Sequence, residues 1–371
     1  MIRAWAPVFA LAILALPFVG WGPVNGDAAV YAHQAGIVDV WQRPSHAGYI
    51  AVLALFYKLV GASSWVVADS LTLLACMAAV YTLGLNAKHP IFTRWFGAAL
   101  LLPYAAHGEV DMVWMALVLG WLYCDHRAAA GVMLGAAISV SPLALLAIPF
   151  GSYKHRRVPV LVISVTLCLL IGFSQGEWLL GDRGLLQGAG TSSLRIDWLV
   201  RRLPVWCLVA ATWRKEHLLL LPLLVAPSDQ PSAVLAVLIA LRSIEAPKRR
   251  VSLVALALGF GVLGLSERAQ QVRKEQRLVA ELARGVVGQA GLVAPWSLGV
   301  RASIATTGDP YALMWRPPNG FVRDQAARWC AGEQSYVLRV EPSAEMGPWG
   351  PNRYEVRREA AWMTGCDADV R

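Results

Sequence analysis

Residues 105–124 read AAHGEVDMVWMALVLGWLYC, a short acidic motif followed directly by a long apolar run. Such a run predicts a helix that is buried or crosses a membrane. Glu109 and Asp111 stand just outside this predicted helix. Because burying a carboxylate in a bilayer costs roughly 3 kcal/mol, acids placed at the edge of an apolar run indicate a functional position at a membrane face.

A second acidic motif lies earlier in the chain, in residues 23–36, PVNGDAAVYAHQAG. Here Gly26-Asp27 follows the first apolar run, which extends from about Ala4 to Trp21. Since no small-residue cleavage site stands before Trp21 and more apolar runs follow, we interpret the first run as a retained anchor and not as a signal peptide. Two such motifs on one face predict an active site at the lipid–water boundary.

The composition indicates a polytopic membrane protein. The chain is 57% hydrophobic and 15% charged, unlike an ordinary globular domain. Its net charge of +9 lies largely in short clusters between apolar runs, as the positive-inside rule describes. No basic stripe interleaved with aromatic residues accompanies them, so nucleic acid is not an expected partner. The clusters are Lys154–Arg157, Arg214-Lys215 and Lys248–Arg250.

The apolar runs predict an all-α membrane domain of about eleven transmembrane helices over residues 1–265, with the N-terminus in the cytoplasm. Residues 129–153 are expected to form two half-length helices, because proline disfavours helix at the residue before it and Ser141-Pro142 interrupts the run. The remaining predicted spans after the anchor are 65–86, 92–106, 112–124, 158–174, 203–213, 217–227, 231–244 and 251–265.

Residues 46–62, HAGYIAVLALFYKLVGA, allow two interpretations. As a transmembrane span, this segment would place Asp27 and Asp111 on opposite faces of the membrane. As an interfacial helix in the first outer loop, it keeps the two acids on one face and leaves the basic clusters inside. Charge placement favours the interfacial helix.

From residue 266 the composition changes, which predicts a small extracytoplasmic α+β domain over 266–371. Apolar residues at helical spacing indicate that it begins with an amphipathic helix. The segments SYVLRV (335–340) and NRYEVRRE (352–359) resemble strands. Cys330 and Cys366 are the only cysteines of this tail, and they are either bridged or free.

In these motifs the chain resembles the C superfamily of membrane glycosyltransferases, and within it the protein O-mannosyltransferase and aminoarabinose-transferase group. The resemblance covers roughly the first 150 residues and implies an enzyme that moves a sugar from a polyprenyl-phosphate-linked donor to an acceptor, by inverting chemistry, at the periplasmic face of a bacterial inner membrane. It is carried by GDAAVY (26–31), PSHAGYIAVLALFYKLVG (44–61), HGEVDM (107–112) and AAAGVMLGAAISVSPLALLAIPF (128–150).

The resemblance also implies roles for individual residues. Asp27 matches the general base, which removes a proton from the acceptor hydroxyl. Asp111, with Glu109 beside it, matches the second acidic motif, which positions donor or acceptor. The candidate substrate-binding residues are Tyr31, His46, Tyr49 and His107, and those expected on the donor phosphate are Arg183, Arg195, Arg201 and Arg202.

No metal or other cofactor is predicted, because relatives of the mannosyltransferase type need none. A divalent cation is a possible addition, since hard cations take oxygen ligands such as these carboxylates. The lipid bilayer and the lipid-linked donor are the expected partners, and the sequence identifies neither the sugar nor the acceptor.

Two other classes of protein remain open. A secondary transporter would need charges at mid-membrane and broken helices, for which Asp69 and the break at Ser141-Pro142 are the only candidates. A non-catalytic membrane scaffold would use its periplasmic tail to bind a partner. Convergence of Asp27 and Asp111 on one cavity would favour the enzyme.

Overall fold

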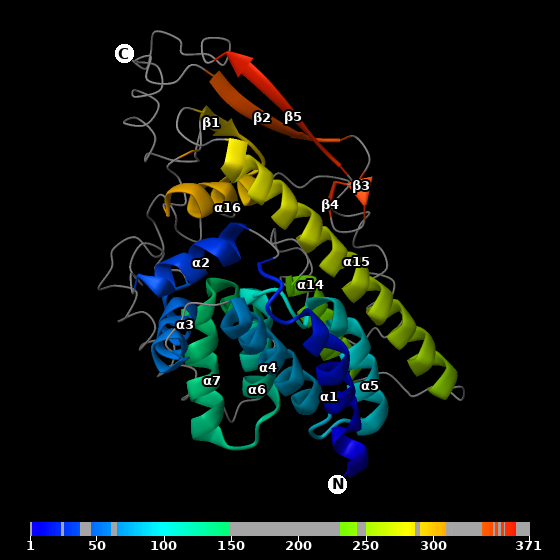
Figure 1. The fold of residues 1–371 in the computed structure, drawn as a ribbon. Coiled ribbons are helices and arrows are strands. Elements are labelled where there is room, and N and C mark those ends of the chain that lie inside the picture. The colour runs from blue at the N-terminus through cyan, green and yellow to red at the C-terminus, as the bar shows by residue number, and fades with distance from the viewer. Residues whose placement is uncertain are drawn as a thin grey trace. The chain divides into compact units, whose positions relative to one another are not determined.

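The computed structural model is mostly helical, with a small sheet near the C-terminus (Figure 1). It divides into two compact units: the first comprises Met1–Gly20 and Val38–Ser266, and the second comprises Trp21–Ile37 and Glu267–Arg371. The structure describes residues 2–23, 26–37, 46–60, 65–148, 231–242, 250–285, 290–308, 313, 336–343, 346–347, 350–351 and 353–360. The predicted spans 158–174, 203–213 and 217–227 lie outside these residues.

The first unit contains the apolar helices. Each predicted span that the structure describes, in whole or in part, is helical there. They are α1 (Ile2–Ala15), η1 (Leu16–Phe18), α3 (Ala47–Val60), α4 (Trp65–Leu83), α5 (Pro90–Leu101), η3 (Leu102–Tyr104), α6 (Val110–Tyr123), α7 (Arg127–Val140), η4 (Pro142–Ala147), α14 (Pro231–Leu241) and the first part of α15 (Arg250–Gly285).

Helix α6 forms the centre of this unit. It packs against α4 on one side and α7 on the other. Its residues are apolar around most of the circumference, and Trp114 and Trp121 are both fully buried. A helix that is apolar all round is one that other helices must surround, and the position of α6 follows from this composition.

Hydrogen bonds define one end of the first unit, which we call the basic end (Ala4, Leu85, Asn86, Lys88 and Asp125). The amide of Asn86, after α4, donates to the carboxylate of Asp125, after α6, at 3.2 and 3.4 Å. Arg94 of α5 donates to the Ala4 carbonyl at 3.2 Å, so the start of α1 lies at this end as well. Lys88 lies two residues before the first residue of α5.

A second set of contacts defines the opposite, acidic end (Gly20, Tyr49, Asp69 and residues 107–111). The Gly20 amide, after α1, donates to the Asp69 carboxylate near the start of α4 at 2.7 Å. Tyr49, near the start of α3, donates to the Gly108 carbonyl at 3.5 Å. Successive helices therefore alternate in direction between the two ends in the series α1, α4, α5, α6 and α7. Helix α3 is the exception, because it begins at the acidic end and the next helix, α4, begins there too.

The predicted break at Ser141-Pro142 is confirmed. Helix α7 ends at Val140, and Ser141 has extended backbone dihedrals (φ −155°, ψ 130°). Its hydroxyl accepts a hydrogen bond from the Leu143 amide at 3.4 Å, which caps the short helix that follows. That second helix is 3-10 in form. The proline at its first position suits a new helix start and not a continued one.

Among the residues that the structure describes, two helices are long and apolar enough to cross a membrane: α4, over Trp65–Leu83, and the Arg250–Arg284 stretch of α15. Shorter apolar helices occupy Arg3–Phe18, Ala47–Val60, Val110–Tyr123 and Ala129–Val140. These lengths are consistent with association with a membrane. The number of about eleven spans stays a prediction.

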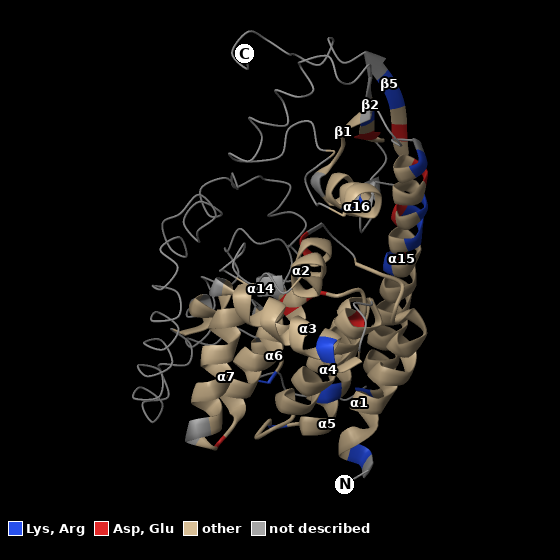
Figure 2. Ribbon diagram, turned by 60° about the vertical axis from the view of Figure 1, so that its left-hand side comes forward, with Lys and Arg blue, Asp and Glu red and all other residues tan. Residues whose placement is uncertain are grey.

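Helix α15 is continuous from Arg250 to Gly285, where the sequence indicated a span over 251–265 and a separate amphipathic helix after it. No proline interrupts the stretch, so the backbone hydrogen bonds continue through the change in composition. Figure 2 shows the change directly, with charged residues crowded on one part of α15 and none along much of the other.

Two glycines of α15 provide a matched test of its packing in the first unit. A Cβ at Gly261 would lie 2.6 Å from the Ala99 carbonyl oxygen of α5, whereas a Cβ at Gly259 would meet nothing within 4 Å. We expect Gly261→Ala to destabilise the protein by about 1–3 kcal/mol through overpacking, and Gly259→Ala to stabilise it by about 0.5–1 kcal/mol. Thermal unfolding of both variants measures the difference, and equal midpoints would contradict the close approach of α5 and α15.

The second unit joins the C-terminal part of the chain to a segment from near the N-terminus. Its sheet has the order β1-β2-β5, with β1 parallel to β2 and β2 antiparallel to β5. The two predicted strands are confirmed as β2 and β5. The elements of this unit are α2 (Gly26–Gly36), the end of α15, β1 (Ala290–Val293), α16 (Trp296–Thr307), β2 (Tyr336–Pro342), β3 (Met346–Gly347), β4 (Gly350–Pro351) and β5 (Tyr354–Ala360).

An apolar core forms where the end of α15, α16 and the sheet meet. It is built from Leu282, Leu292, Leu298, Ala302, Leu313 and Val340. Helix α2, which the sequence assigned to an outer loop of the membrane domain, packs against α16. The helix that carries Asp27 is therefore part of the same unit as the tail.

Candidate functional site

The acidic end of the first unit contains most of the predicted site residues that the structure describes. His107 and Gly108 both have left-handed backbones, with φ of 75° and 69°, and together they turn the chain from η3 into α6. His107 is fully buried. A left-handed residue other than glycine costs free energy and is common at functional sites, so this turn is a candidate site on backbone grounds as well.

Glu109 and Asp111 follow this turn but have different surroundings. Glu109 occupies the N-cap position of α6, yet its side chain makes no capping hydrogen bond and the residue is only 5% exposed. Its carbonyl accepts from the Thr72 hydroxyl of α4 at 3.5 Å. The Glu109 side chain therefore neither caps α6 nor lies exposed to solvent.

Asp111 lies in the first turn of α6 and is half-buried. Its carboxylate accepts a hydrogen bond from the indole nitrogen of Trp114 at 2.8 Å. The N-terminal turn of a helix also stabilises a negative charge, since the amide groups there are directed at it. The Trp114 hydrogen bond and the helix N-terminus thus both favour the charged Asp111 carboxylate.

Tyr49 and His46 bring the start of α3 to the same end. Tyr49 is fully buried, donates to the Gly108 carbonyl and lies within electrostatic reach of Asp69 and Asp111. His46 Nδ1 lies 2.7 Å from the Val140 carbonyl, which means that this nitrogen carries the proton. The structure therefore brings together Tyr49, His107, Glu109 and Asp111, and it places His46 beside the end of α7.

Asp69 is buried in α4, with no exposed surface. Its carboxylate accepts the hydrogen bond from the Gly20 amide, which anchors the chain after η1. This contact gives the deep charge a structural role at the acidic end.

Asp27 and Tyr31 lie on α2, in the second unit. Helix α2 begins at Gly26, so Asp27 occupies its first turn. Asp27 is half-buried, and Tyr31 is buried. Because Asp111 belongs to the first unit, convergence of the two acids on one cavity stays a prediction.

A buried pair of charged residues, Arg301 and Glu275, holds the chain segment that precedes α2. Arg301 of α16 donates from Nη1 to the Pro23 carbonyl and from Nε to the Ser297 carbonyl, each at 3.2 Å. Its third nitrogen, Nη2, forms a salt bridge with Glu275 of α15, and both residues are less than 10% exposed. Arg301 thus ties the segment before Asp27 to two helices of the tail.

Three further contacts complete this cluster. The Tyr354 hydroxyl and the Gln271 amide donate to Glu275 Oε1 at 3.1 and 3.0 Å. Burial, and then the neighbouring Glu275 carboxylate, raise the pKa of the Tyr354 phenol, so it remains a donor at neutral pH. The guanidinium of Arg273 lies 3.4 Å above the Trp21 ring.

Sequence reasoning missed Arg301 and Glu275, although one signal was available. Arg301 is the only charged residue in WSLGVRASIATT, the sequence of α16. A single charge in an otherwise uncharged helix indicates a buried partner, because a buried charge must be paired. Its partner could not be identified from the pattern, since Glu275 is one of many charges on α15.

The predicted phosphate-binding residues Arg183, Arg195, Arg201 and Arg202 lie outside the described residues. Within the part of the chain that the structure describes, no group of three or more His, Cys, Asp or Glu side chains is arranged to hold a metal ion. Comparison with protein-family models, curated proteins and solved structures found no match.

Proposed function

We propose that the chain is a membrane glycosyltransferase that moves a sugar from a polyprenyl-phosphate-linked donor to an acceptor hydroxyl at the periplasmic face of the inner membrane. One observation carries the proposal: Tyr49, His107, Glu109 and Asp111 gather at one end of a unit built from apolar helices. An acidic site at the end of a helical bundle suits a reaction between a lipid-linked donor and a polar acceptor.

The arrangement of the helices supports this orientation. Lys88 and Arg250 precede or begin helices at the basic end, which the positive-inside rule assigns to the cytoplasm. The acidic end is then periplasmic. Helix α3 begins at that end and the next helix begins there too, which supports an interfacial α3.

In the proposed reaction, the acceptor oxygen attacks the anomeric carbon of the donor sugar. The bond between that carbon and the phosphate oxygen breaks, and polyprenyl phosphate leaves with the electron pair. Asp27 removes the proton from the attacking hydroxyl, and Asp111 orients one of the substrates. The buried Arg301 acts as a positioning residue, since it holds the Pro23 carbonyl just before the helix of Asp27.

Transfer from labelled polyprenyl-phosphate sugars in membranes tests the proposal directly. We expect wild-type protein to transfer label from at least one donor, and Asp111→Asn to lower the rate by about 10²-fold, because a misplaced substrate reacts that much more slowly. Asp125→Asn, at the basic end, is the matched control and should retain activity. Absence of transfer from every donor would contradict the proposal and favour the scaffold.

The transporter alternative rests on Asp69 and on the end of α7 at Val140. Transport would require the Asp69 carboxylate to bind a substrate or a coupling ion, and its hydrogen bond with Gly20 already gives it a structural partner. Substrate uptake into vesicles that depends on Asp69 but not on Asp111 would favour the transporter.

A further inference from the structure

A pocket of about 620 Å³ lies at the basic end of the first unit, between the start of α5 and the start of α15. Its volume is in the range of pockets that bind small molecules. None of the predicted catalytic or substrate-binding residues that the structure describes lines it. The lining residues are Lys88, His89, Pro90, Ile91, Phe92, Trp95, Arg250, Val251, Val254, Ala255 and Leu258.

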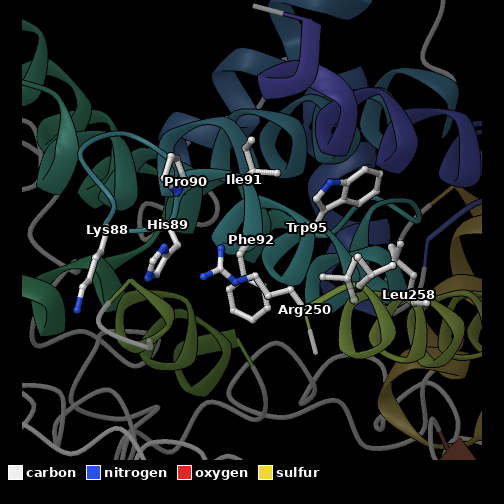
Figure 3. Close-up of a pocket in the computed structure, with 11 residues that line it drawn as sticks. Lys88, His89, Pro90, Ile91, Phe92, Trp95, Arg250 and Leu258 are labelled. Atoms are coloured by element: carbon white, nitrogen blue, oxygen red, sulfur yellow. The ribbon is translucent and has the colours of Figure 1, made fainter. Parts of the chain in front are cut away.

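The pocket has a polar part and an apolar part. In Figure 3 the side-chain nitrogens of Lys88, His89 and Arg250 lie on one side, and Trp95 and Leu258 lie on the other. The remaining lining side chains are apolar. The pocket thus combines a basic side with an apolar side.

Two helix termini add to the positive charge on the basic side of the pocket. Helix α5 begins at Pro90 and the 36-residue α15 begins at Arg250, and both of these first residues line the pocket. The N-terminus of a helix carries a partial positive charge and favours anions. The basic side chains and the two helix N-termini therefore both favour an anionic ligand.

We propose that this pocket binds an anionic phospholipid of the cytoplasmic leaflet. The phosphate lies between Lys88 and Arg250, and one acyl chain lies along Phe92, Trp95 and Leu258. A soluble phosphate would contact only the basic side of the pocket and would leave its apolar side without a ligand. Ile91 and Val251, at 46% and 84% exposed, are apolar residues that a lipid chain would cover. The inference requires that the helices lie in a membrane, and it is independent of sugar transfer.

Native mass spectrometry of the detergent-purified full-length protein provides the test, with phosphatidylglycerol and phosphatidylcholine as probes. We expect a clear preference for phosphatidylglycerol. Each cationic side chain near an anionic headgroup contributes about fivefold in affinity, so Lys88→Ala with Arg250→Ala should weaken binding by about 25-fold. The exposed pair Lys58 and Arg277, which do not line the pocket, provide a double-alanine control with the same charge.

A second pair of variants tests the apolar part. Ala255→Trp fills the pocket and should abolish the preference, whereas Leu256→Trp, on the neighbouring exposed position outside the pocket, should leave it intact. Quenching of tryptophan fluorescence by brominated phosphatidylglycerol gives an independent readout, since the Trp95→Phe variant should lose part of it.

Equal binding of the two phospholipids, unchanged binding in the Lys88/Arg250 variant, or unchanged quenching in Trp95→Phe would overturn the proposal. A preference for polyprenyl phosphate over phosphatidylglycerol that Ala255→Trp removes would also overturn it, because the pocket would then belong to the donor lipid. If the wild-type protein binds phosphatidylglycerol as expected but transfers no sugar from any donor, only the proposed function is contradicted.

Discussion

Replacing Asp27 by asparagine is expected to reduce sugar transfer by about 10²–10⁴-fold, the usual contribution of a general base. The substitution keeps the size and shape of the side chain and removes only its ability to accept a proton. Asp27 is half-buried in the first turn of α2, where an amide is also tolerated, so the protein should accumulate and insert normally. Initial rates with the best donor, normalised to protein in the membrane, measure the effect.

His33→Gln provides the control for Asp27, because His33 lies on the same helix and is also half-buried. It should leave transfer near the wild-type rate. If Asp27→Asn were fully active, Asp27 would have no part in the reaction, and the base would have to be sought among the acids of the first unit.

Arg301→Ala is expected to destabilise the second unit by about 3–5 kcal/mol, the usual effect of removing one partner of a buried ion pair. The substitution would leave the Glu275 carboxylate buried without its salt-bridge partner and the Pro23 carbonyl without its donor. Hydrogen exchange of the amides in β1 and β2 measures the free energy of opening. Since α2 loses its contact through Pro23, transfer should fall in parallel.

Arg277→Ala is the matched control for Arg301, because Arg277 is exposed on α15. It should change the opening free energy by less than about 0.5 kcal/mol. Replacing Glu275 and Arg301 together by leucine and methionine should recover part of the stability that Arg301→Ala loses, since no unpaired charge stays buried. Equal exchange rates for Arg301→Ala and Arg277→Ala would show that the buried pair does not support the tail.

The sequence patterns predicted correctly those features that depend only on neighbouring residues, namely two strands and two helix boundaries. The alternation in SYVLRV and NRYEVRRE gave strands β2 and β5, since period-two patterning is a property of the strand itself. The serine and proline at 141–142 gave the end of α7 for the same reason. The acidic motif at 107–111 was located correctly next to the start of a helix.

The missed features depend on packing between distant parts of the chain. The association of α2 with α16 leaves no pattern in residues 26–36, because small apolar residues suit many partners. Glu109 is buried, and its backbone carbonyl accepts a hydrogen bond from Thr72 of α4, 37 residues earlier in the chain. The continuity of α15 was missed because a change from apolar to charged residues alters the environment of a helix without ending it.

The composition of the second unit has a consequence for the timing of biosynthesis. Helix α2 leaves the ribosome early, whereas its partner α16 is made only after most of the chain has been synthesised. Contacts between such distant segments form late in folding. The helix that carries Asp27 therefore acquires its packing partner only near the end of translation, and a nascent or truncated chain that lacks α16 would leave α2 without the helix that it packs against.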